Sequence, residues 1–122
     1  MKKVMLVEDD DIMVSLLQTL LEFEGYRVAS YQLGENLIAA IRSESPDLVL
    51  LDVHLKTRDG GELNGFDLLP QLQQDPALQD IKVIMSSGLD FVEKSKQAGA
   101  DGFIHKPYMP EQLIKIIKQT LS

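Results

Sequence analysis

The chain has 122 residues, no cysteine and a formal net charge of −7 at neutral pH. This length suits one domain with its own hydrophobic core, and the acidic balance argues against nucleic acid as the main partner, because such binding depends on clustered Lys and Arg. The lack of cysteine excludes thiolate metal sites and thiol catalysis. No stretch is apolar for long enough to form a signal peptide or to cross a membrane, so we expect a soluble, cytoplasmic protein.

Short apolar runs alternate with amphipathic segments along the first half of the chain. The runs predict strands at residues 4–7, 26–31 and 48–51. Helical spacing of apolar residues predicts one helix from about residue 12 to a stop at Gly25, and a shorter one over 36–42. The unbroken apolar run at 48–51 is typical of a strand that is covered on both faces.

The second half continues the alternation after a long polar loop. We predict a helix from about 66 to 74, strands at 81–85 and 102–105, a short helix at 91–97 and a last helix that begins at Pro110. Five strand–helix units in a row predict a doubly wound α/β fold, in which helices cover both faces of one parallel sheet. We expect residues 1–122 to form this single domain.

Charged and polar side chains gather where the predicted strands end. Four carboxylates, Glu8 to Asp11, follow the first strand, and neighbouring carboxylates about 4 Å apart repel by roughly 4 kcal/mol at an effective dielectric constant of about 20. Asp10 and Asp11 are explained by the helix that begins there, because a helix N-terminus favours negative charge. Asp52 ends the third strand, Ser86 and Ser87 the fourth, and Lys106 the fifth.

Ligands of open parallel sheets bind at the carboxyl ends of the strands, so these side chains are expected to converge on one edge. Glu8, Asp9 and Asp52 together would supply three hard oxygen donors, which suit Mg²⁺. A bound cation would offset the repulsion between these acids.

The chain resembles the receiver domains of two-component response regulators over essentially its whole length. The resemblance is carried by LVED with Glu8 and Asp9, by LLD ending at Asp52, by MSSG with Ser87 and by HKP with Lys106. AGADGF just before that lysine is also typical of the family. The resemblance implies a flavodoxin-like (βα)5 fold with strand order 2-1-3-4-5.

The resemblance also implies roles for the acidic residues. Asp52 would be the phosphoacceptor, which takes a phosphoryl group from a phosphohistidine of a sensor histidine kinase or a histidine phosphotransfer protein. Asp9 would bind Mg²⁺ directly and Glu8 through water, with Asp52 and the backbone carbonyl of His54 as the other protein ligands. The only chemistry expected is phosphorylation of Asp52 and its own dephosphorylation, so the protein would not be an enzyme in the ordinary sense.

Three further residues have implied roles in the response to phosphorylation. Lys106 would pair with phosphoryl oxygens, and Ser87 would donate a hydrogen bond to the phosphoryl group. This bond would draw the loop after the fourth strand inward and let Phe103 rotate into the space behind it. Family members also carry a cis bond before the proline of the KP motif, so we expect one at Lys106–Pro107.

The segment after Asp52 departs from the family pattern. Gly65 lies farther from Asp52 than the corresponding glycine of most receivers, so KTRDGGELN resembles an inserted loop over about residues 56–64. Such a loop beside the metal site would be either a lid or partner-contacting element or a tolerated surface insertion.

Two other functions stay open at this point. A Mg²⁺-dependent phosphatase of the aspartate-nucleophile type usually needs a second Asp two positions after the nucleophile, where this chain has His54. A degenerate receiver would act as a constitutive protein-binding module. A receiver would act on an unknown downstream protein or output domain, with a phosphorylation-dependent homodimer as one option, and without direct contact to nucleic acid or membrane.

Overall fold

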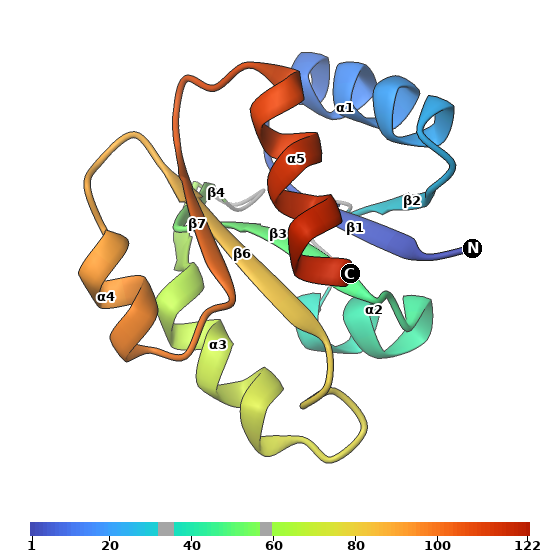
Figure 1. The fold of residues 1–122 in the computed structure, drawn as a ribbon. Coiled ribbons are helices and arrows are strands. Elements are labelled where there is room, and N and C mark those ends of the chain that lie inside the picture. Colours follow the sequence, from blue (N-terminus) through green and yellow to red (C-terminus); the bar gives the residue numbers. More distant parts are fainter. Residues whose placement is uncertain (32–35, 57–59) are drawn as a thin grey trace.

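The computed structural model describes residues 1–31, 36–56 and 60–122. A five-stranded parallel sheet has helices on both faces (Figure 1). Its strands are β1 (Lys3–Val7), β2 (Arg27–Ser30), β3 (Leu48–Asp52), β6 (Lys82–Ser87) and β7 (Gly102–His105), in the spatial order β2-β1-β3-β6-β7. Because β6 and β7 are the fourth and fifth strands of this sheet along the chain, the predicted order 2-1-3-4-5 is confirmed.

The helices lie where the apolar spacing places them. They are α1 (Asp11–Phe23), α2 (Leu37–Glu44), α3 (Gly65–Gln74), α4 (Val92–Gln97) and α5 (Pro110–Leu121). α1 and α5 cover one face of the sheet and α2 and α3 the other (Figure 1). Side-chain oxygens of Asp10, Asn36 and Asn64 accept backbone N–H groups at the starts of α1, α2 and α3, which satisfies donors that a helix start leaves unpaired.

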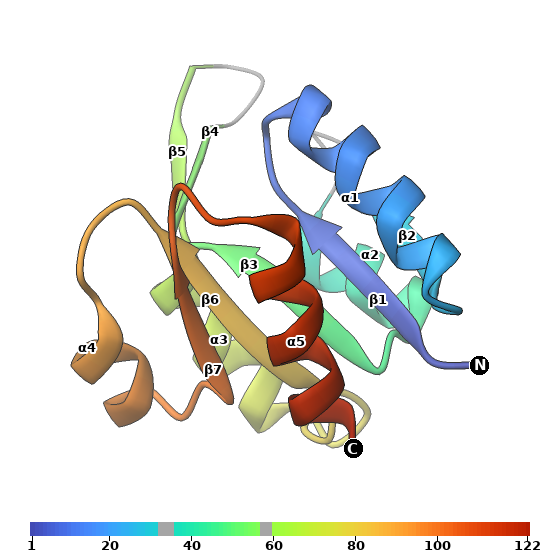
Figure 2. The same cartoon turned by 45° about the horizontal axis from the view of Figure 1, so that its top comes forward.

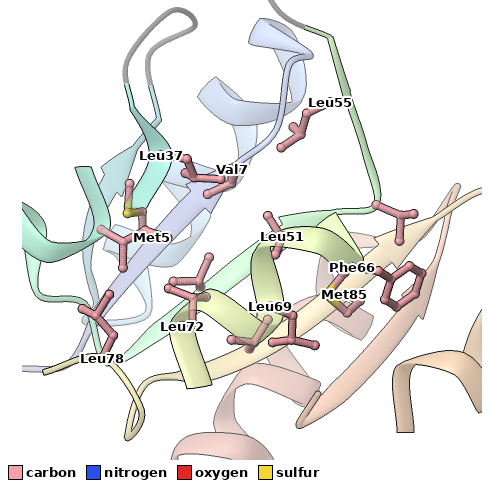
Figure 3. Close-up of a cluster of buried hydrophobic side chains, with 14 residues drawn as sticks. Met5, Val7, Leu37, Leu51, Leu55, Phe66, Leu69, Leu72, Leu78 and Met85 are labelled. Carbon is pink, nitrogen blue, oxygen red and sulfur yellow. The ribbon is translucent and has the colours of Figure 1, made fainter. Parts of the chain in front are cut away.

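Alternation along the strands divides the core into two clusters, one on each face of the sheet. Figure 3 shows the cluster between the sheet and α2 and α3, which includes Met5, Leu51 and Met85. The opposite cluster, beneath α1 and α5, includes Leu6, Leu50 and Ile84. β3 is buried along its whole length, as its unbroken apolar run predicts. This two-sided burial holds the carboxyl ends of β1 and β3 in place.

The prediction of a long polar loop after Asp52 is wrong for part of the segment. Residues on either side of 57–59 form an antiparallel hairpin of β4 (His54–Lys56) and β5 (Glu62–Asn64). Leu55 and Leu63 pair across the hairpin, and Leu55 is fully buried against the core, so packing stabilises the two short strands. The hairpin extends beyond the carboxyl edge of the sheet, beside the start of α1 (Figure 2). Residues 57–59 of the inserted segment lie outside the described residues.

Within the described ranges, no helix is both long enough and apolar enough to span a lipid bilayer. The expected cis peptide bond at Lys106–Pro107 is present, directly after β7.

Candidate functional site

Three carboxylates meet at the carboxyl edge of the sheet. Val7 of β1 is in register with Leu51 of β3. The residues that follow them, Glu8 and Asp52, therefore lie side by side. Glu8, Asp9 and Asp52 each place a carboxylate oxygen within 4.8 Å of those of the other two. Glu8 and Asp52 are buried, with 6% and 4% of their surfaces exposed, and Asp9 is half-buried. The predicted convergence of these acids is confirmed.

Lys106 supplies the positive charge that offsets the repulsion between the two buried acids. Its Nζ donates to Glu8 Oε2 at 2.6 Å and lies 2.7 and 2.9 Å from Asp52 Oδ1 and Oδ2. Burial alone would lower the pKa of Lys106, but the hydrogen bonds to Asp52 and Glu8 outweigh this effect and raise it. The ammonium group therefore stays protonated between the carboxylates.

The carboxyl group of Glu8 holds its proton more tightly than that of an exposed glutamate, mainly because it is buried. Burial raises the pKa of Glu8 to about 7, and the negative charge of Asp52 adds to the rise, while the hydrogen bond from Lys106 opposes it. Tyr108 is affected by the same site. Burial, and to a lesser extent the negative charge of Glu8, raises the pKa of its phenol to about 12. The acidic cluster can therefore accept further positive charge, and three clustered carboxylates have the chemistry of a site for a hard divalent cation.

Asp9 connects the acidic cluster to the inserted hairpin. Its Oδ2 accepts the backbone N–H of Lys56 in β4 at 3.1 Å. His54 begins the same strand with its side chain directed to Glu62 of β5, where Nδ1 and Oε1 are 2.9 Å apart. The sequence does not reveal the Lys56 contact, because it depends on a hairpin that the apolar pattern does not predict.

The two serines that end β6 have different surroundings. Ser86 Oγ donates to Asp52 Oδ1 at 2.8 Å, whereas Ser87 Oγ accepts the backbone N–H of Leu89 at 3.1 Å. Successive strand residues point to opposite faces, and Ser86 is in register with Asp52. The structure thus brings Ser86 to the acid, while Ser87 is buried at the start of the loop between β6 and α4.

Phe103 lies on β7, at the edge of the sheet, and is half-buried against the cluster of Figure 3. Its ring meets the His105 ring edge-on at a centroid distance of 4.9 Å. His105 Nε2 in turn lies 3.6 Å from Asp90 Oδ1, in the loop before α4. Phe103 therefore sits between the core and an exposed edge beside that loop.

Comparison with known proteins agrees with this arrangement. The profile of the response regulator receiver domain family matches residues 4–118. The alkaline phosphatase synthesis transcriptional regulatory protein PhoP of Bacillus subtilis is 31% identical over 121 residues, which cover 98% of this chain and 48% of PhoP. The polar-differentiation response regulator DivK of Brucella ovis is 30% identical over 124 residues, which cover 99% of this chain and 97% of DivK. The chain thus spans about half the length of PhoP and nearly all of DivK.

Solved structures share the fold. The chemotaxis response regulator CheY4 of Vibrio cholerae superposes with a TM-score of 0.85 at 24% identity, and the match covers 99% of both chains. The N-terminal domain of the nisin resistance regulator NsrR superposes with a TM-score of 0.82 at 30% identity, over 99% of this chain and 98% of that one. Because the family profile matches nearly the whole chain, and three carboxylates and Lys106 converge on one edge of the sheet, this chain belongs to the response regulator receiver domain family.

Proposed function

We propose that Asp52 is the residue of this receiver domain that accepts a phosphoryl group, from a phosphohistidine of a sensor kinase or phosphotransfer protein. A carboxylate oxygen of Asp52 would form the new bond to phosphorus, while the bond from phosphorus to the histidine nitrogen breaks and leaves its electron pair on the imidazole. The observation that carries this proposal is the position of Asp52: it ends the central strand β3, and the ammonium group of Lys106 lies between its carboxylate and that of Glu8.

The donor set of the site fits Mg²⁺. We propose that Asp9 binds the ion directly and that Glu8 binds it through water. Asp52 and the backbone carbonyl of His54 would be the other protein ligands. Three carboxylate oxygens already lie within 4.8 Å of one another, which supports this assignment. When bound, Mg²⁺ would supply positive charge against the incoming phosphoryl group. The Asp9 side chain is held near the site by the N–H of Lys56.

Lys106 and Ser87 would then respond to the phosphoryl group. Lys106 lies within hydrogen-bond distance of both oxygens of Asp52, so its ammonium group can pair with phosphoryl oxygens there. Ser87 uses its hydroxyl oxygen as acceptor for Leu89, which leaves the hydroxyl hydrogen for a phosphoryl oxygen. Drawing this hydroxyl toward Asp52 would move the loop before α4, and Phe103 would rotate inward from its half-buried position.

The output surface follows from this switch. We propose that the surface of α4 and β7 reports phosphorylation to a downstream protein or output domain, and that residues 1–122 make up one receiver domain. A phosphorylation-dependent homodimer is one form that such an output can take. PhoP, which is about twice as long as the matched region, is named a transcriptional regulatory protein.

Labelling with acetyl phosphate and Mg²⁺ tests the proposed acceptor. We expect wild type to take up one base-labile phosphoryl group and Asp52→Asn to take up none, while Asp67→Asn, an exposed residue on α3, is labelled like wild type. Intact-protein mass spectrometry gives the stoichiometry. Steady release of phosphate over many turnovers would instead support a phosphatase, and a wild type that is never labelled would support a constitutive binding module.

A further inference from the structure

Ser86 contacts the proposed acceptor in a way that the function above does not use. Only 1% of the surface of Ser86 is exposed, and its hydroxyl donates to Asp52 Oδ1 at 2.8 Å. The register between β3 and β6 pairs these two residues directly, so the contact is fixed by two buried central strands. The hydroxyl is thus a built part of the site and not a solvated surface group.

The two oxygens of the Asp52 carboxylate have unequal surroundings. Among the described parts of the chain, Oδ1 has two close donors, the Ser86 hydroxyl at 2.8 Å and Lys106 Nζ at 2.7 Å. Oδ2 has Lys106 Nζ at 2.9 Å. Oδ2 is therefore the oxygen with capacity for a bond to phosphorus, while Oδ1 stays hydrogen-bonded to Ser86 as the carbonyl oxygen of the acyl phosphate.

We propose that the Ser86 hydroxyl shortens the lifetime of phosphorylated Asp52 by stabilising the carboxylate as it leaves. This inference rests on the proposed function of Asp52. In hydrolysis, the oxygen of water bonds to phosphorus and the bond from phosphorus to Oδ2 breaks. The electron pair returns to the carboxylate, and the proton of the water leaves with phosphate or solvent.

The direction of the effect follows from where the negative charge lies. In the acyl phosphate Oδ1 is a neutral carbonyl oxygen, whereas in the free carboxylate it shares a full negative charge. Hydrogen bonds to charged acceptors are about twice as strong as neutral ones. The transition state of phosphoryl transfer is loose, so most of the charge has already returned to the leaving oxygens. Ser86 therefore stabilises the transition state of hydrolysis more than it stabilises phosphorylated Asp52.

Loss of the hydrogen bond from Ser86 should affect phosphorylation and dephosphorylation of Asp52 differently. When Asp52 attacks a phosphoryl donor, the starting carboxylate and a loose transition state both carry negative charge at Oδ1. The hydrogen bond from Ser86 then stabilises both nearly equally, and its loss changes the rate of phosphorylation little. A purely structural disturbance of the site would slow both directions.

Replacement of Ser86 by a pair of residues of equal shape tests this inference. Ser86→Thr keeps the hydroxyl and Ser86→Val replaces it with a methyl group. Each variant is phosphorylated with acetyl phosphate and Mg²⁺, freed of the donor by rapid desalting, and followed for loss of the phosphoryl group. We expect Ser86→Val to retain the group about threefold to tenfold longer than Ser86→Thr, with similar initial rates of phosphorylation.

Ser95 offers a matched control, because it is also a buried serine, 2% exposed, and its hydroxyl has no hydrogen-bond partner among the residues that the structure describes. Ser95→Ala should keep the wild-type lifetime. If Thr or Val at position 86 prevents folding, the comparison of Ser86→Ala with wild type decides the question with the same expected direction.

Equal lifetimes for the hydroxyl and methyl variants would overturn the role of Ser86, and so would parallel losses in the rates of phosphorylation and dephosphorylation. Failure of the wild type to take up any phosphoryl group would instead overturn the proposed function of Asp52. The two failures are therefore distinguishable.

Discussion

Gly65 begins α3 directly against the backbone of β3. A Cβ at this position would lie 2.7 Å from the carbonyl oxygen of Asp52 and 2.9 Å from Met85 Cε. The backbone oxygen cannot move without moving the site, so we expect Gly65→Ala to lower the free energy of unfolding by about 1–3 kcal/mol. Urea denaturation measures the loss. Gly88→Ala is the control, because its Cβ would have open space around it, and an equal loss in both variants would contradict this explanation.

Lys106 is expected to stabilise the metal-free protein as well as to bind phosphoryl oxygens. Lys106→Met leaves the buried carboxylates of Glu8 and Asp52 without their cation, which we expect to lower the free energy of unfolding by about 3–5 kcal/mol at neutral pH. Added Mg²⁺ should restore part of this loss, and denaturation with and without the ion measures both effects.

The exposed ion pair between Lys118 and Glu24 provides the control for that experiment. Lys118→Met should leave the free energy of unfolding nearly unchanged, because surface ion pairs contribute little. A loss in Lys106→Met no larger than in Lys118→Met would show that Lys106 does not offset the charge of the buried acids.

The sequence predicts which charged residues form the site better than it predicts the hydrogen-bond partners of the individual side chains. Glu8 and Asp52 lie at the ends of apolar runs that predict buried strands, and Lys106 follows a short predicted edge strand, so their convergence follows from the fold. The partner of each serine depends on strand register and on which face a side chain occupies. Ser86 and Ser87 both end β6, and only the register with β3 shows that Ser86 meets Asp52.

Among the elements, α1 begins at a cap that lies beside the acidic cluster. The side chain of Asp10 accepts the N–H groups of Ile12 and Met13, as its position before the apolar spacing predicts. Asp10→Ala should lower the free energy of unfolding by about 1 kcal/mol, measured by thermal or urea denaturation. Asp11→Ala removes a charge from the first turn without removing the cap, so a loss as large as that of Asp10→Ala would contradict the capping role.

The hairpin of β4 and β5 is the element that the sequence did not predict. Each strand has three residues, too few for a period of two to stand out, and a glycine-containing polar segment lies between them. Leu55 stabilises the hairpin by packing in the core, which is a tertiary effect that local pattern does not contain. The other elements differ from their predicted bounds by only one or two residues at most ends, where capping side chains and strand pairing decide the limits.

For the whole molecule, the order of the strands determines where chemistry can occur. β1 and β3 are neighbours at the centre, and the chain winds outward from them in both directions (Figure 1). The direction of winding reverses between β1 and β3, and doubly wound folds bind ligands at the carboxyl ends of the strands at such a point. Alternating strands and helices made this arrangement predictable from sequence, whereas the contact of the inserted hairpin with Asp9 required the folded structure.

We expect the carboxylate at the end of β3 to take the phosphoryl group. The most direct test is to phosphorylate the protein with acetyl phosphate, reduce the acyl phosphate with borohydride, and map the modified residue by peptide mass spectrometry. We predict homoserine at position 52, formed only after phosphorylation with Mg²⁺ present. Homoserine at position 9 or at another acidic residue, or its absence from a protein that binds Mg²⁺ and is folded, would contradict the account.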